Sequence, residues 1–174
     1  MKKTFLVLLI TLLATVVFAF PAGTFNLGGN AGFTTYKANS DAKASNTIYF
    51  NPNIGYLFMD NVSADVLLGF SSNSHNKATS TSFDAGLGAR YFLGMGDNKL
   101  YAGLGAIFGS HSYKFGSVKT TDSGTHLNAK LGFLVPVTPD VFLDLGAKYE
   151  MGMGDYKDNT LGINLGLQIF TPLF

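Results

Sequence analysis

Hydrophobic and polar positions alternate one by one along most of this chain. The last segment, residues 160–174, shows the pattern most clearly, with an aliphatic residue at every odd position from 161 to 169 and Gly, Asn or Gln between them. Such alternation is typical of a β-strand, whose successive side chains point to opposite faces. A strand with one wholly aliphatic face has to belong to a larger sheet.

Seven earlier segments repeat the pattern, and no window beyond the first residues shows helical periodicity. The eight predicted strands are residues 24–37, 47–58, 62–70, 81–93, 99–111, 125–137, 141–150 and 160–174. Their connections alternate between short turns (59–61, 94–98, 138–140) and longer polar loops (38–46, 71–80, 112–124, 151–159). This asymmetry predicts an all-β fold, an eight-stranded antiparallel up-and-down transmembrane β-barrel of the outer-membrane type.

The N-terminus has the pattern of a secretory signal. Two lysines precede an apolar run over residues 5–18, and the tripeptide Val17-Phe18-Ala19 suits signal peptidase. A retained membrane anchor is the alternative, but two threonines interrupt the run, and it is shorter than the roughly 20 apolar residues that a spanning helix needs. We therefore predict a cleaved signal peptide over residues 1–19 and the barrel domain over residues 20–174.

Alternation alone does not decide which face points inward, because a soluble barrel hides its apolar residues while a membrane barrel exposes them to lipid. The second face is rich in glycine rather than in the Lys, Glu and Thr of a soluble surface. Its glycines are at positions 28, 32, 55, 69, 86, 88, 103, 105, 132 and 146. Because glycine weakens strands, its abundance on one face indicates a narrow, crowded lumen. We expect the apolar face to meet lipid.

Composition narrows the function further. The chain has no cysteine, which excludes a lipoprotein anchor, a disulfide framework and a thiolate metal site. Of its 12 basic residues two lie in the signal, which leaves ten against 11 acidic residues. That balance provides no basic surface for nucleic acid, so lipids or small solutes are the expected partners.

Seven charged residues share the inward parity, and a lumen of low polarity requires them to be paired. They are Asp65, Asp84, Arg90, Lys130, Asp144, Lys148 and Glu150. Counting from the connections places Asp65 about opposite Arg90 and Lys130 about opposite Asp144. We interpret the set as a lumen charge network that holds the barrel together rather than as a substrate relay, because interior ion pairs commonly do no chemistry.

Large inward side chains come from four strands near the short turns. They are Leu57, Phe92, Tyr101 and Phe142. We expect them to plug the periplasmic end, and we expect no wide water-filled channel, because an eight-stranded barrel is only just wide enough for its own side chains. The arrangement leaves room for a small apolar pocket above the plug, which would suit a lipid-like or hydrophobic ligand.

Candidate catalytic residues are few. The three histidines, all at the loop end, are His75, His111 and His126. With Ser110, Ser112 and Asp122, the last two histidines can be drawn as a hydrolase or acyl-transfer constellation, or all three as a metal site. Neither drawing has a specific spacing, so we predict no catalytic residues, no cofactor and no metal.

The signal, the eight alternating strands, the loop asymmetry and the closing Leu-Gly-Ile-Asn-Leu-Gly-Leu-Gln-Ile-Phe resemble the small outer-membrane β-barrel family that includes OmpA- and OmpX-type barrels. The resemblance covers the entire mature chain. It implies insertion by the outer-membrane assembly machinery, which in that family recognises a last strand ending in an aromatic residue. Here Thr171-Pro172-Leu173 separates Phe170 from the terminal Phe174, so both phenylalanines are candidate assembly signals. Proline donates no hydrogen bond, so Pro172 has to lie at a strand end or on a free edge.

The resemblance leaves the activity open, because one fold carries many functions. Our leading hypothesis is a non-enzymatic protein of the cell outer membrane with a structural or surface-interaction role, its four long loops outside and both termini in the periplasm. The alternatives are a narrow porin-like path for small or hydrophobic solutes, a lipid-modifying enzyme that uses His111 or His126, and a soluble periplasmic or secreted barrel. Expected partners are outer-membrane lipids and lipopolysaccharide, the assembly machinery and an unknown surface ligand, and the barrel is expected to be a monomer.

Overall fold

The structure is a computed structural model that describes residues 20–36, 45–75, 78–153 and 159–172. The predicted signal peptide, Phe174 and parts of three predicted loops lie outside the described residues. In the described part of the chain, no helix is long and apolar enough to cross a bilayer.

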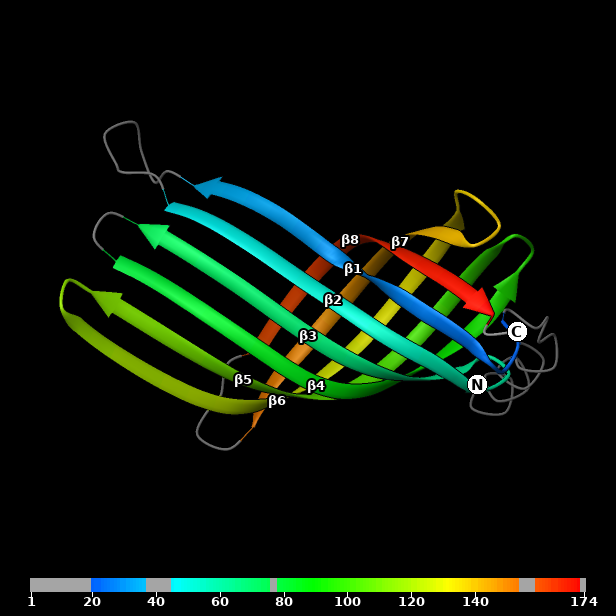
Figure 1. Ribbon diagram of the computed structural model, residues 1–174, viewed down its shortest axis with the longest axis horizontal. Helices are drawn as coiled ribbons and strands as arrows, with labels where there is room; N and C mark the ends of the chain where they lie inside the picture. Colours follow the sequence, from blue (N-terminus) through cyan, green and yellow to red (C-terminus); the bar gives the residue numbers. More distant parts are fainter. Residues whose placement is uncertain (1–19, 37–44, 76–77, 154–158, 173–174) are drawn as a thin grey trace, which may run out of the picture.

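Eight antiparallel strands follow one another around a closed barrel, as the sequence predicts (Figure 1). The strands are β1 (Thr24–Tyr36), β2 (Ser45–Met59), β3 (Val62–His75), β4 (Ala78–Met95), β5 (Asn98–Phe115), β6 (Val118–Pro136), β7 (Val141–Met153) and β8 (Asn159–Pro172). Each strand pairs with the next, and β8 returns to pair with β1. Pro172 is the last residue of β8, at a strand end as its missing donor requires.

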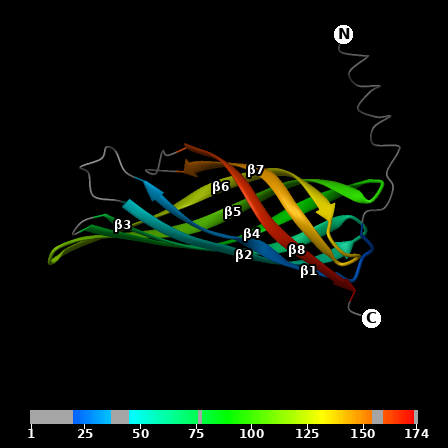
Figure 2. The ribbon, with the colours of Figure 1, turned by 90° about the horizontal axis from the view of Figure 1, so that it is seen from above.

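The two ends of the barrel differ. The end formed by the β2–β3, β4–β5 and β6–β7 connections is called the turn end here, and the opposite one the loop end. At the turn end the chain reverses with Asn61 and Gly96 at φ of 65° and 66°, a left-handed conformation that suits these residue types. The first and last described residues also lie at the turn end (Figure 2).

Several strands are longer than the sequence pattern predicts. The predicted loop 112–124 is instead a two-stranded extension, in which β5 runs to Phe115 and β6 begins at Val118. Gly116, at φ 60°, supports the tight turn between them. The strand pattern was hidden here because the outward parity of this extension carries Ser, Thr and Lys in place of apolar residues, although Ser and Thr pairs are compatible with a β-ladder.

The apolar face points outward, which confirms the predicted orientation of the sheet. Leu104, Leu161 and Ile163 expose 72%, 78% and 93% of their surface, whereas the charged residues of the opposite parity face the lumen. Inside, glycine makes room for large neighbours: a Cβ atom at Gly132 would lie 2.4 Å from the ring of Tyr101. The glycine-rich face is therefore the crowded interior of a narrow barrel.

Candidate functional site

An apolar plug fills the turn end of the lumen. The four predicted plug residues lie in one buried cluster with three others, so that the plug consists of Phe20, Leu57, Phe92, Tyr101, Leu134, Phe142 and Phe170. Each is at most 7% exposed. The rings of Phe20 and Phe170 stack at a centroid distance of 3.7 Å, and both meet Phe92 and Phe142 edge to face. Such contacts add to the free energy gained from burying the rings.

Phe20 enters the plug because the β2–β3 turn holds its backbone. The Phe20 N–H donates to Oδ1 of Asn61 at 3.0 Å, and the Asn61 N–H donates to the Phe20 carbonyl at 3.0 Å. The Ala22 N–H donates to Oδ1 of Asp60 at 2.8 Å. The segment before β1 is therefore folded across the barrel end. Sequence reasoning missed Phe20 because it precedes the first alternating strand.

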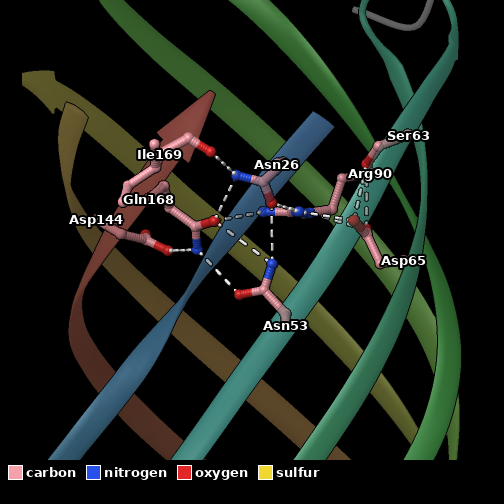
Figure 3. A network of polar contacts seen from close by, with 8 residues as sticks. All are labelled: Asn26, Asn53, Ser63, Asp65, Arg90, Asp144, Gln168 and Ile169. Carbon is pink, nitrogen blue, oxygen red and sulfur yellow. Dashed lines mark hydrogen bonds and ion pairs between the residues drawn. The ribbon is translucent and has the colours of Figure 1, made fainter. Parts of the chain in front are cut away.

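A buried polar layer lies directly above the plug (Figure 3). It consists of Asn26, Asn53, Ser63, Asp65, Arg90, Asp144 and Gln168, which come from six strands. Arg90 is its centre: Nε and Nη2 donate to the two carboxylate oxygens of Asp65 at 2.9 and 2.7 Å. The guanidinium also lies 5.2 Å from the ring centroid of Phe92. The predicted pairing of Asp65 with Arg90 is confirmed, although Asp65 is opposite Gly88 and the long Arg90 side chain reaches it diagonally.

The layer continues across the closing strands. Asn26 of β1 donates to Gln168 of β8 at 2.8 Å and accepts from Nη2 of Arg90. Gln168 donates to Asp144 at 2.9 Å, and the Tyr101 hydroxyl donates to the other Asp144 oxygen at 2.8 Å. The layer therefore couples the β1–β8 closure to the ion pair. The uncharged members, Asn26, Asn53, Ser63 and Gln168, were not predicted, although their inward parity could have signalled them.

Above the polar layer lies a cavity of about 410 Å³. All seven predicted lumen charges line it, together with further polar residues and the apolar Leu67 and Ile107. A pocket therefore lies above the plug as predicted, but its lining is mixed rather than apolar. The reason is that the inward face of the loop half carries Asn, Lys, Glu and His between its glycines.

The seven charges do not form one connected network. Asp65, Arg90 and Asp144 belong to the polar layer, and Lys148 bonds Glu150 at 3.1 Å higher in the lumen. Within the described residues, neither Asp84 nor Lys130 forms a hydrogen bond or ion pair. The predicted placement of Lys130 opposite Asp144 is wrong: Lys130 is opposite Lys148, and Asp144 is opposite Leu134.

The β6–β7 connection gives the correct register. The backbone N–H groups of Val137 and Thr138 both donate to the Val141 carbonyl, so the chain reverses around Pro139. Counting from Pro139, which is also the centre of the predicted turn 138–140, places Lys130 opposite Lys148, so the prediction was four residues off in the count.

His111 and His126 do not form the hydrolase or acyl-transfer site, or the metal site, that the sequence suggested as alternatives. Nδ1 of His111 lies 2.6 Å from Oγ of Ser82, and His111 meets His126 with ring centroids 6.4 Å apart. Ser112 instead pairs with Thr121, and Ser110 with Ser123. In the described ranges, no three acidic or histidine side chains are grouped so that they could hold a metal ion.

Only one of the two candidate assembly signals lies among the described residues. Phe170 is 3% exposed in the centre of the plug. Phe174 lies outside the described residues. Phe170 therefore has a packing role in the folded barrel that the sequence pattern did not indicate.

Comparisons with known proteins agree with this fold. The family model of the outer membrane protein beta-barrel domain matches residues 5–168. Among solved structures, Neisserial surface protein A is similar with a TM-score of 0.64 and 17% identity, over 87% of this chain and 98% of that one. The N-terminal β-barrel domain of Pseudomonas aeruginosa OprF has a TM-score of 0.61 and 14% identity, over 86% and 98%. Ail, the attachment invasion locus protein of Yersinia pestis, has a TM-score of 0.57 and 17% identity, over 86% and 99%. No curated protein sequence matched the chain.

Proposed function

Since this chain belongs to the outer membrane protein beta-barrel domain family, we propose that it is a non-enzymatic, non-conducting scaffold that presents a binding surface outside the cell. The observation that carries this proposal is the double closure of the lumen. The apolar plug fills the turn end, and the polar layer crosses the barrel directly above it. Water and ions have no wide path through two such layers.

The surface to be presented is the loop end, and its most prominent part is the β5–β6 hairpin. Within the described residues, pairing of β6 with β7 extends to Thr125, whereas pairing of β5 with β6 continues to Phe115 and Val118 (Figure 1). Tyr113, Phe115 and Val118 near its tip are 52%, 55% and 66% exposed. Exposed apolar residues on a rigid support are typical of a binding surface. The names of two structural neighbours, a surface protein and an attachment protein, are compatible with such a role.

The proposal includes the route and orientation expected from the sequence. The signal peptide over residues 1–19 directs export, the assembly machinery inserts the barrel, and both termini remain periplasmic. The folded monomer meets lipids and lipopolysaccharide through its apolar outer face. Burial of Phe20 supports cleavage close to residue 19, because Phe20 already belongs to the folded plug.

The closed lumen predicts that the protein does not conduct ions. Refolded barrel inserted into a planar lipid bilayer is expected to give no steady conductance, because the plug and the polar layer exclude a continuous water column. A wide porin in the same bilayer serves as the positive control, and a gel run with and without boiling checks that the barrel is folded. Regular ohmic steps from the folded protein would instead support the narrow porin-like path.

The orientation predicts which turns an antibody reaches on intact cells. An epitope inserted between Gly116 and Ser117, in the β5–β6 turn, is expected to be stained without permeabilisation. The matched control carries the same epitope between Gly96 and Asp97, in the β4–β5 turn, and should be stained only after the outer membrane is opened. The reverse pattern would place the loop end in the periplasm and remove the proposed surface role.

A further inference from the structure

The barrel is closed over only part of its height. Strands β1 and β8 pair at six positions, from Thr24 with Pro172 to Gly29 with Leu167. Beyond that point residues 30–36 pair with β2 and residues 159–166 pair with β7, and within the described residues these two edges do not pair with each other. Figures 1 and 2 both show β1 and β8 separating toward the loop end. The facing edges 30–36 and 159–166 are called the β1–β8 seam here.

The backbone around Gly29 accounts for the point at which β1 and β8 stop pairing. Gly29 has φ 141°, a conformation that side-chain-bearing residues rarely adopt, and its partner in β2 is Pro52, which donates no ladder hydrogen bond. Across the seam, a Cβ atom at Gly166 would lie 2.4 Å from the Gly29 carbonyl oxygen. The strands therefore come closest at Gly29 and Gly166 and separate above them.

The cavity above the polar layer reaches this seam. Its lining includes Gly29 and Asn30 from the β1 edge and Thr160 and Asn164 from the β8 edge. At about 410 Å³ it falls within the usual size of small-molecule pockets. The cavity therefore extends to edges of β1 and β8 that no strand pairing joins within the described ranges.

A row of basic residues crosses the cavity toward the seam. Following the strand register, Arg90 is opposite Gly103, Gly103 is opposite Lys130, Lys130 is opposite Lys148, and Lys148 is opposite Gly162 on the seam. Arg90 is neutralised by Asp65 and Lys148 by Glu150. Lys130 lies between them without a carboxylate in ion-pair contact among the described residues.

The remaining acidic side chains form no ion pair with Lys130 in the described part of the chain. Asp144 already accepts hydrogen bonds from Tyr101 and Gln168. Asp84 is opposite Gly109, six residues along β5 from the position opposite Lys130, which corresponds to about 20 Å along the strand. Lys130 therefore provides a cationic site in the cavity.

The outer side of the seam is apolar. Phe33 on the β1 edge is 62% exposed, and Ile163 and Leu165 on the β8 edge are 93% and 61% exposed. The inner side, by contrast, carries asparagine, threonine and glycine. A molecule that crosses the seam therefore contacts polar side chains inside the barrel and apolar side chains outside it.

We propose that the cavity binds the carboxylate of a long-chain fatty acid at Lys130, and that the acyl chain leaves the barrel between β1 and β8 to lie along the outer apolar surface. The anionic head meets the unpaired ammonium group of Lys130, and the chain stays in an apolar environment. This binding is independent of the proposed surface role, since it uses the lumen rather than the hairpin.

The test uses the folded protein in phosphatidylcholine nanodiscs and two spin-labelled stearates, with the nitroxide near the carboxylate or near the methyl end. The label near the carboxylate is expected to be immobilised, and the label near the methyl end to keep the mobility of acyl chains that border the barrel. Immobilisation of both labels would overturn the exit through the seam. Lipid-like mobility of both would overturn the binding site.

Two controls separate the charge from the fold. Lys130→Met is expected to weaken binding by about tenfold, the effect of removing one charge-assisted hydrogen bond. Lys114→Met, at the exposed tip of β5, should bind as the unaltered protein does. The methyl ester of the same labelled stearate, tested on the unaltered protein, should not be immobilised, and this control does not depend on a variant folding. Equal immobilisation of ester and acid would contradict recognition by Lys130.

Discussion

Replacing Arg90 by methionine is expected to lower the free energy of unfolding by about 3–5 kcal/mol, because it leaves the Asp65 carboxylate buried without its partner. Arg90 is 6% exposed and Asp65 3%, so water compensates little for the lost pair. The variant also removes the donors to Asn26 and Gln168, which connect the closing strands. Equilibrium unfolding in urea, followed by circular dichroism because the chain has no tryptophan, measures the loss.

A double variant tests whether the buried charge is the cause. Asp65→Asn combined with Arg90→Met removes both charges, and its loss of stability should be smaller than that of Arg90→Met alone. Lys114→Met, at an exposed position, should change stability by no more than about 0.5 kcal/mol. A double variant that is no more stable than the single one would mean that Arg90 acts through its packing and not through its charge.

Replacing Phe170 by alanine is expected to cost about 3–5 kcal/mol, the usual effect of emptying a packed aromatic site. Its ring stacks on Phe20 and meets Phe92 and Phe142, so the substitution opens the centre of the plug. The same urea titration of refolded protein measures the effect. Phe115→Ala is the matched control, because that ring is 55% exposed at the hairpin tip and should contribute little.

The Phe170 variant also separates packing from recognition by the assembly machinery. If Phe170 acts through packing, the purified variant refolded in detergent without the machinery is already unstable. If it acts only as an assembly signal, the refolded variant keeps its stability and only its yield in the outer membrane falls. Phe174→Ala, compared in cells, shows whether the terminal phenylalanine is the recognised residue.

The sequence by itself determined the number and order of the strands, the face of each residue within them and the identity of most inward groups. These follow from a period of two, which is local information that each strand carries independently of its neighbours. For that reason Leu57, Phe92, Tyr101 and Phe142 could be assigned to one plug before any register was known. The Asp65–Arg90 pair was predictable as well, because a two-residue register error is within reach of an arginine side chain.

The tertiary structure alone decided what depends on register and closure. Alternation places Asp144 and Lys148 on the same lumen face, and only the pairing of β6 with β7 decides that Lys130 is opposite Lys148. The extension of β5 and β6 carries no outward apolar stripe, so only its hydrogen-bonded ladder reveals it as strand.

The plug and the seam both depend on contacts between distant strands, which the sequence pattern does not specify. Phe20 and Phe170 are far apart in sequence, and only closure of the barrel brings their rings together. The β1–β8 seam likewise arises where Gly29 meets Pro52 on one side and Gly166 on the other. Alternation along a strand specifies which side chains face the lumen, but the contacts between distant strands decide which of them meet and where the barrel stays open.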